Sequence, residues 1–227
     1  MKQIKLGIIG PGSIADVVME AIAGKVDLIR YAVASRDINK AQEFARKHQF
    51  QKAYGSYQEL YEDKEVDLVY IATPHAFHYE QMKEAIQYKK HILCEKVFVL
   101  HKAQAEEIFR LAKENEVYVA EAMLTPYLPS TQKIKTLLEQ GVIGKVLEYK
   151  GVFANDLMHV ERVVTKSLGG GALLDIGIYP LQFAFSLFGH TYELQNIKIQ
   201  TYHEIDQSTA FTLEFSSGVK AHIYTSI

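Results

Sequence analysis

Apolar residues in the first half of the chain follow two alternating spacings. Short apolar runs predict strands, and the segments between them carry apolar residues three and four positions apart, which predicts helices. The expected strands are 4–9, 28–34, 68–73, 91–94 and 117–120, and the expected helices are 14–23, 39–48, 78–88 and 102–115. Strands that alternate with helices need crossover connections, which favour a parallel sheet. The sequence therefore predicts an α/β, doubly wound N-terminal half.

The pattern changes after about Thr125. A glycine run, Gly169–Gly171, comes before an apolar helix, and the tail from Asn196 to Ile227 predicts three strands with Ser216-Ser217-Gly218 as the last hairpin turn. The other elements expected here are a helix over 131–139, an extended segment over 145–154 and the apolar helix itself over 175–188. We expect two domains, 1–122 and 123–227, the second being α+β with an open antiparallel sheet.

A glycine-rich turn joins the first expected strand to the first expected helix. Gly10-Pro11-Gly12-Ser13-Ile14-Ala15 follows the G-x-G-x-x-A pattern. Such a fingerprint needs a tight turn at the first glycine, close backbone approach to a pyrophosphate at the second, and a small residue for helix packing. The helix N-terminus then offers N–H groups to the phosphates. The turn predicts a dinucleotide-binding Rossmann domain in which Gly10, Gly12, Ser13 and Ile14 contact the cofactor.

The residues at the end of the second expected strand bear on whether the cofactor is NAD or NADP. An acidic side chain about 20 residues after the glycine turn binds the adenosine ribose hydroxyls of NAD, whereas this strand ends in Ser35-Arg36-Asp37. Because a guanidinium pairs bidentately with phosphate, Ser35 and Arg36 favour NADP over NAD. Asp37 is left either as a ribose acceptor or as the N-cap of the next helix.

The composition is that of an ordinary globular protein. The 227 residues carry a net charge of -2 and are 48% apolar, which disfavours nucleic acid and acidic membranes as partners. The apolar stretches are strand-sized, and the N-terminus shows no signal-peptide pattern, so we expect a cytoplasmic protein without a membrane span. The single cysteine, Cys94, predicts a buried structural thiol, and the nine histidines show no metal-ligand spacing.

Segments spread over the whole chain resemble the Gfo/Idh/MocA (glucose-fructose oxidoreductase / inositol dehydrogenase) oxidoreductase family, in its branch of dimeric dihydrodiol dehydrogenases and NADP-linked xylose dehydrogenases. They are GIIGPGSIA, AVASRD, IATPHAFH, CEKVFVL, GVIGKV and GGGALLDIGIYPL. The resemblance implies a nucleotide-binding domain followed by a domain that carries substrate determinants and the contacts of a homo-oligomer. Members of the family usually continue beyond the position of Ile227, so it also implies an incomplete second sheet.

The resemblance also implies site residues. The Glu-Lys-Pro motif of the family supplies an active-site lysine, here Lys96, and its proline is Val97 in this chain. The bond after that lysine is commonly cis, so with valine either the bond is still cis or Lys96 lies differently. The motif that lies along the cofactor, together with the glutamate before the lysine, corresponds to Thr73, Pro74, His75, His78 and Glu95.

Asp175 and Tyr179 take the family positions of a substrate-binding acid and a catalytic residue. Four residues apart on a helix, they share one face. Oxidation of an alcohol needs a base for the hydroxyl proton, which we assign to Tyr179 with Lys96 as its electrostatic partner. Without the family pattern, a tyrosine on an apolar helix is usually core and an aspartate after glycines usually a helix cap.

The leading interpretation is an NAD(P)-dependent dehydrogenase that transfers hydride between the nicotinamide and a hydroxyl or carbonyl of a sugar, diol or polyol. A catalytically silent dinucleotide-binding sensor or regulator is the alternative. Both predict cofactor binding. They differ in whether substitution of Lys96 or Tyr179 abolishes turnover.

Overall fold

The computed structural model describes residues 3–227. The chain divides into two compact units, one ending at Ala122 and the other running from Met123 to Ile227. Each contains one sheet with its own helices and is described by itself.

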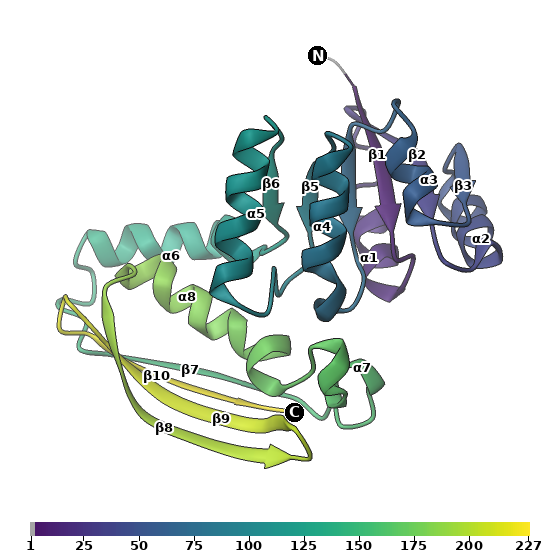
Figure 1. Ribbon diagram of the computed structural model, residues 1–227. Helices are drawn as coiled ribbons and strands as arrows, with labels where there is room; N and C mark the ends of the chain where they lie inside the picture. Colours follow the sequence, from purple (N-terminus) through teal and green to yellow (C-terminus); the bar gives the residue numbers. More distant parts are fainter. Residues whose placement is uncertain (1–2) are drawn as a thin grey trace. The chain divides into compact units, whose positions relative to one another are not determined.

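The first unit is built on a six-stranded parallel sheet with the order β3-β2-β1-β4-β5-β6 (Figure 1). Its strands are β1 (Ile4–Ile9), β2 (Leu28–Ala34), β3 (Lys52–Tyr54), β4 (Leu68–Ile71), β5 (His91–Cys94) and β6 (Val119–Glu121). The order reverses between β1 and β4, so the connections after these two strands leave in opposite directions. Doubly wound sheets bind ligands at the carboxyl ends of the strands around such a switch point.

Helices cover both faces of this sheet. They are α1 (Ser13–Ala21), α2 (Ile38–His48), α3 (Tyr57–Glu62), α4 (His78–Gln87) and α5 (Lys102–Glu114), with a short 3₁₀ turn, η1 (His75–Phe77), before α4. One face packs against α3, α4 and α5 through buried side chains such as Leu60, Met82 and Ile108. The other packs against α1 and α2 through Met19 and Phe44. The doubly wound α/β prediction is confirmed.

Besides the turn η1, the structure adds one strand and one helix to the elements expected in this unit. Strand β3 has three residues and α3 has six, too short for a clear apolar period. A signal for α3 was nevertheless present, because Ser56 and Glu59 form a capping box in which each side chain binds the other's backbone N–H. The thiol of Cys94 is buried as expected, and burial raises its pKa.

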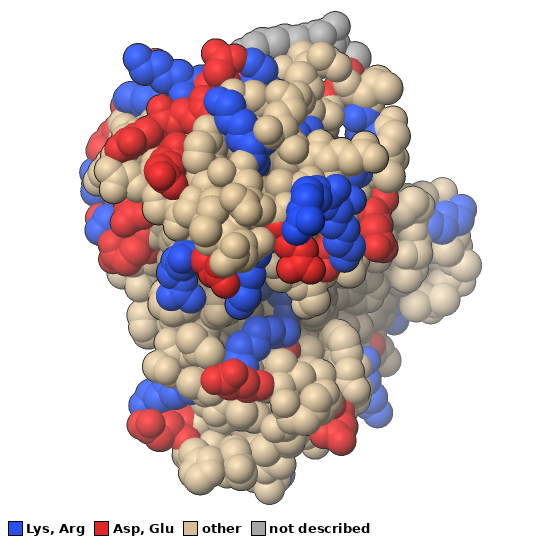
Figure 2. Space-filling view, turned by 90° about the vertical axis from the view of Figure 1, so that its right-hand side faces the viewer, with Lys and Arg blue, Asp and Glu red and all other residues tan. Residues whose placement is uncertain are grey.

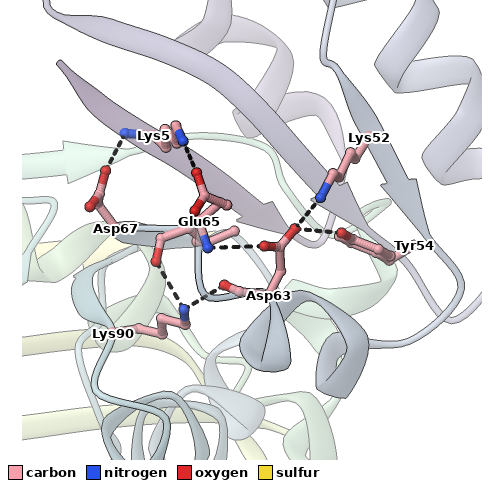
Figure 3. A network of polar contacts seen from close by, with 8 residues as sticks. Lys5, Lys52, Tyr54, Asp63, Glu65, Asp67 and Lys90 are labelled. Carbon is pink, nitrogen blue, oxygen red and sulfur yellow. Dashed lines mark hydrogen bonds and ion pairs between the residues drawn. The ribbon is translucent and has the colours of Figure 1, made fainter.

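A network of charged side chains ties together the amino ends of the strands (Figure 3). The Asp63 carboxylate accepts hydrogen bonds from Lys52 Nζ at 2.7 Å, the Tyr54 hydroxyl at 2.6 Å and the Glu65 N–H at 3.0 Å. The buried Lys90 ammonium donates to the carbonyl oxygens of Asp63 and Val66. This edge lies opposite the carboxyl ends of the strands, where doubly wound sheets bind ligands. We therefore assign the network a role in the stability of the unit.

Asp63 makes the stability of this unit dependent on pH. Burial raises the pKa of its carboxyl, but the hydrogen bonds from Lys52, Tyr54 and the Glu65 N–H outweigh burial and lower the pKa from 3.8 to about 2. The stabilisation is therefore complete above pH 4 and is lost as the pH falls towards 2. In urea titrations, the difference in unfolding free energy between the wild type and Asp63→Asn should shrink by about 1 kcal/mol between pH 6 and pH 3. A difference that stays constant over this range would contradict the assignment.

The second unit contains a four-stranded sheet with the order β7-β10-β9-β8. Its elements are β7 (Glu148–Ala154), β8 (Tyr192–Tyr202), β9 (Ile205–Phe215), β10 (Lys220–Ser226), α6 (Pro129–Glu139), α7 (Glu161–Val164), α8 (Ile178–Phe188), the 3₁₀ turns η2 (Thr125–Tyr127) and η3 (Lys166–Leu168), and the π-helical turn η4 (Leu173–Gly177). The three C-terminal strands pair antiparallel as expected. A purely antiparallel sheet is wrong, however, because β7 pairs parallel with β10. The long connection through α8, β8 and β9 returns the chain in the same direction, which makes the sheet mixed.

Helix α8 covers one face of this sheet (Figure 1). Its side chains, including Leu181, Phe185 and Phe188, pack with Phe211 and Phe215 of β9. Within the described residues, one stretch, Lys166–Phe188, is long and apolar enough to cross a membrane by length and composition. It is broken at Gly169, which has a φ of 79°. Packing on the sheet accounts for the apolar character of α8.

The surface charges are mixed on the face shown in Figure 2, where Lys and Arg side chains lie among Asp and Glu side chains. This distribution agrees with the net charge of -2.

Candidate functional site

The glycine turn between β1 and α1 has the geometry that the fingerprint demands. Gly10 has a φ of 80°, and a Cβ built on it would lie 2.8 Å from the carbonyl oxygen of Ala72 in the connection after β4. Only glycine fits this position. A Cβ on Gly12, by contrast, would meet no described atom within 4 Å. The backbone at Gly12 is therefore open to a close approach from outside.

Helix α1 begins directly after this turn. Gly12 occupies its N-cap position, and none of the described side chains caps it with a hydrogen bond. The first N–H groups of an α-helix have no helical partner and carry the positive end of its dipole. Ser13 is exposed and Ile14 is 41% exposed, while Ala15 is buried against the sheet. The open turn and the uncapped helix end form a cradle that fits a pyrophosphate.

Arg36 lies beside this cradle, just after β2. Its guanidinium carbon is 5.9 Å from the centre of the Phe77 ring, which belongs to the turn after β4. Burial raises the pKa of the Tyr57 hydroxyl, whereas the charge and hydrogen bond of Arg36 lower it, which places Tyr57 at the same guanidinium. Ser35 is buried, and its Oγ accepts the N–H of Asp37 at 3.2 Å. The Asp37 carboxylate caps α2 by accepting the N–H of Asn39, which settles the N-cap alternative.

The segment from Thr73 to His78 passes along the same edge of the sheet. The Thr73 hydroxyl donates to Gln81 Oε1 at 2.6 Å, and Pro74 leads into the turn η1. His75 is 7% exposed and His78 is completely buried. The two ring nitrogens of His78 face the carbonyl oxygens of Thr73 and Val97, at 2.8 and 2.9 Å. In the structure His78 links two loops, and its direct contact with a ligand stays a prediction.

Lys96 lies just beyond the carboxyl end of β5. The peptide bond between Lys96 and Val97 is cis, the form that the family resemblance implied. Glu95 is buried, and its carboxylate accepts the Tyr70 hydroxyl and the N–H of Lys96. Burial raises the pKa of Tyr70 and the Glu95 charge raises it further, so the phenol keeps its proton and donates. The carboxylate of Glu95 is thus engaged inside the unit, and cofactor contact by this residue stays a prediction.

The structure brings two further residues into this region, Tyr70 and Glu121. Glu121 ends β6 and accepts the N–H of Phe98 at 2.8 Å. A signal for Glu121 existed in the sequence, because it directly follows an expected strand whose carboxyl end belongs to the binding edge. Tyr70 gave no signal, since an aromatic residue inside an apolar run reads as core.

The two site residues predicted in the second unit lie at the start of α8. The expectation of one regular α-helix over Asp175–Phe188 is wrong in its first turn, because Leu173–Gly177 forms a π-helical turn. Pro180 explains the widened turn: proline has no N–H to donate, and its ring crowds the carbonyl four residues earlier. Asp175 and Tyr179 therefore stand on either side of a change in helix type, and a simple four-residue spacing does not describe them.

Asp175 is 2% exposed and accepts a hydrogen bond from Arg162 Nη1 of α7 at 2.7 Å. The Tyr179 ring packs against Phe153 of β7, with ring centres 5.6 Å apart. The sequence gave no signal for Arg162, because only the tertiary fold brings α7 to Asp175.

Asp206 of β9 holds the glycine run that leads to Asp175. Its Oδ2 accepts the N–H of Leu173 at 2.8 Å and the Thr209 hydroxyl at 2.7 Å. A Cβ on Gly171 would lie 2.2 Å from Oδ1 of the same carboxylate. Only a glycine at position 171 leaves room for the Asp206 carboxylate. By accepting the Leu173 N–H, Asp206 caps the start of the helical segment, which has no capping side chain of its own.

The predicted residues thus form two groups. Those of the first unit gather at the carboxyl edge of one sheet, from Gly10 through Arg36 and Thr73 to Lys96. Asp175 and Tyr179 form the second group, and their pairing with Lys96 stays a prediction. In the described residues, no group of three His, Cys, Asp or Glu side chains lies together in a way that could hold a metal ion.

The fold and the cradle define a dinucleotide-binding domain of the Rossmann type. A family profile described as "Oxidoreductase family, NAD-binding Rossmann fold" matches residues 4–123, and one described as "GFO/IDH/MocA C-terminal domain" matches residues 131–227. The chain belongs to the Gfo/Idh/MocA oxidoreductase family.

Relatives of known name include trans-1,2-dihydrobenzene-1,2-diol dehydrogenases. Those of Danio rerio, Xenopus tropicalis and Homo sapiens are 38%, 36% and 35% identical over 82%, 98% and 86% of this chain. The matches cover 56%, 69% and 59% of the relatives' own lengths.

Solved structures with the same fold include an NADP-bound ketoreductase and an NAD-binding oxidoreductase. A 3-ketoreductase from Actinomadura kijaniata in complex with NADP and TDP-benzene has a TM-score of 0.93 and 27% identity, over 98% of this chain and 70% of that chain. An NAD binding oxidoreductase from Klebsiella pneumoniae has a TM-score of 0.87 and 27% identity, over 99% and 66%.

Proposed function

We propose that this protein is an NADP-linked oxidoreductase that acts on a hydroxyl or carbonyl group of a diol, sugar or polyol. The observation that carries the proposal is the placement of Lys96. Lys96 lies at the same carboxyl edge of the sheet as the pyrophosphate cradle, on a segment whose backbone is held by buried or partly buried side chains. The names of the relatives and of the NADP-bound ketoreductase support this class of substrate.

The chain's own residues would share the chemistry as follows. The cofactor supplies or accepts the hydride when it is bound. Tyr179 takes or gives the hydroxyl proton of the substrate, and the Lys96 charge stabilises the phenolate and polarises the substrate oxygen. Asp175, held by Arg162, orients the substrate hydroxyls. This division of roles requires the second unit to present Tyr179 to Lys96.

A preference for NADP over NAD is supported by the surroundings of Arg36. The guanidinium lies 5.9 Å from the centre of the Phe77 ring and hydrogen-bonds Tyr57, and its planar donors match a phosphate. The only carboxylate in Ser35-Arg36-Asp37 is engaged in capping α2. A 2′-phosphate would therefore meet a cation and a hydroxyl here.

Arg36→Ala should lower the affinity for NADPH about 10- to 100-fold, because a charge-assisted hydrogen bond is lost. The affinity for NADH should change by less than about threefold. Fluorescence titration with both cofactors measures the two dissociation constants. Arg46→Ala, which removes an exposed arginine from the last turn of α2, serves as the matched control. An unchanged ratio of NADPH to NADH affinity in Arg36→Ala would remove the role given to Arg36.

The function itself is tested by titrating NADPH and NADH and then screening diols, aldoses and ketoses for a change in absorbance of the reduced nicotinamide. We expect cofactor binding and turnover of at least one vicinal diol or sugar. Binding without turnover across a broad panel would instead favour the catalytically silent sensor. Absence of binding would reject both.

Association of copies through the second sheet stays a prediction. Exposed apolar side chains on that sheet support it, among them Val152 of β7 and Tyr224 of β10, which are 68% and 42% exposed and paired in register. The cytoplasmic location also stays a prediction.

A further inference from the structure

The three residues that begin with Lys96 are held to the first unit by buried or partly buried side chains. The Lys96 N–H donates to Glu95 Oε2 at 3.3 Å, and the carbonyl oxygen of Val97 lies 2.9 Å from His78 Nδ1. The Phe98 N–H donates to Glu121 Oε1 at 2.8 Å. Backbone groups beyond a strand end have no ladder partner, and leaving them unpaired in a buried place costs free energy. Here the partners are the side chains of the neighbouring Glu95, of His78 in α4 and of Glu121 in β6.

Glu121 is rigidly placed for this task. It is the last residue of β6, paired in register with Cys94 of β5, and the next N–H, that of Ala122, donates to the carbonyl oxygen of Cys94 at 2.7 Å. The sheet therefore fixes the backbone of Glu121 relative to the end of β5, from which Lys96 follows two residues later. By accepting the Phe98 N–H, the carboxylate on this rigid strand end restrains the path of the chain after Lys96.

Electrostatics connects the same residues. Burial raises the pKa of Glu121, the Phe98 N–H lowers it, the Glu95 carboxylate raises it and the Lys96 ammonium lowers it, with a raised pKa as the result. The Lys96 charge therefore acts on Glu121 directly. The carboxylate accepts a hydrogen bond from the segment after Lys96, and the Lys96 charge favours its ionised form.

We propose that Glu121 is a positioning residue for Lys96: by holding the Phe98 N–H from the end of β6, it fixes the direction in which the lysine leaves the sheet. The inference rests on the proposed function in giving Lys96 a role in turnover. Its structural part, the hold on the 96–98 segment, concerns the chain alone.

Two substitutions separate the hydrogen bond from other effects. Glu121→Gln keeps an oxygen that accepts the Phe98 N–H, whereas Glu121→Leu keeps most of the volume and removes the acceptor. The matched control is Asp67→Leu. Asp67 is another acidic residue that accepts a backbone N–H, that of Lys5 at 2.8 Å, at the opposite edge of the same sheet.

We expect kcat to fall at least about tenfold in Glu121→Leu and to stay within about threefold of the wild type in Glu121→Gln and Asp67→Leu. The KM for NADPH should change by less than about threefold in all three. Melting temperatures identify losses of stability shared by Glu121→Leu and Asp67→Leu. If kcat falls equally in these two variants, or if Glu121→Gln is as slow as Glu121→Leu, the positioning role is rejected.

A second readout does not need an active enzyme. Hydrogen exchange at the amides of Lys96 and Phe98, measured without cofactor, should accelerate at least about tenfold in Glu121→Leu and remain near the wild-type rate in the other two variants. Unchanged exchange in Glu121→Leu would overturn the proposal. A wild type without turnover, but with this exchange pattern, would reject the proposed function and keep the hold of Glu121 on the segment.

Discussion

Replacing Lys96 with methionine is expected to lower kcat about 10²- to 10³-fold while the dissociation constant for NADPH changes by less than about threefold. Methionine keeps much of the length of lysine and removes its charge. The loss falls on turnover because the charge is needed when the substrate oxygen becomes more negative. Steady-state kinetics and fluorescence titration of the same preparations measure the two effects.

Lys113→Met provides the control for this experiment. Lys113 is an exposed lysine in the last turn of α5, so its loss should leave kcat and cofactor affinity unchanged. A Lys96→Met protein that keeps more than a third of the wild-type kcat would show that Lys96 does not act in the reaction. Weakened NADPH binding with normal kcat would make Lys96 a cofactor ligand instead.

Gly12→Val is expected to lower the affinity for NADPH at least about 100-fold, which corresponds to about 2.7 kcal/mol, without a measurable loss of stability. The backbone at Gly12 is extended, with φ -112° and ψ -170°, which a β-branched residue adopts readily. A Cβ there meets no described atom within 4 Å. The side chain would instead fill the space through which the pyrophosphate approaches the end of α1.

Gly10→Ala is the matched comparison. It should lower stability rather than act chiefly on the affinity for NADPH. Its positive φ and the 2.8 Å approach to the Ala72 carbonyl should cost about 1 to 3 kcal/mol of stability. Thermal denaturation and NADPH titration of both variants distinguish the two roles. A stable Gly12→Val protein with normal NADPH affinity would show that the cradle does not bind the cofactor.

Local sequence pattern was sufficient for much of the first unit. The limits of β1, β2 and β5 agree with those expected, and the fingerprint at Gly10 and Gly12 identified the cradle. Periodicity and turn chemistry are properties of a few neighbouring residues, so they can be read without the fold. Strand β3 and helix α3 were missed because three and six residues carry too little of a period.

Contacts between distant residues were beyond this kind of prediction. The parallel pairing of β7 with β10 depends on how the chain returns after α8. The hydrogen bond from the Leu173 N–H to Asp206 joins residues 33 positions apart. The ion pair of Arg162 with Asp175 joins α7 to the π-helical turn η4.

The sequence by itself determined the doubly wound fold and the glycine turn of the dinucleotide cradle, because strand–helix alternation and turn chemistry are local patterns. The candidate lysine came from the family resemblance of the segment around Lys96. The tertiary structure decided how that lysine is held. Glu121 is 25 residues from Lys96, and Tyr70 is 25 residues from Glu95. Sheet pairing alone brings β4, β5 and β6 together, and it therefore supplies the buried partners that no local pattern indicates.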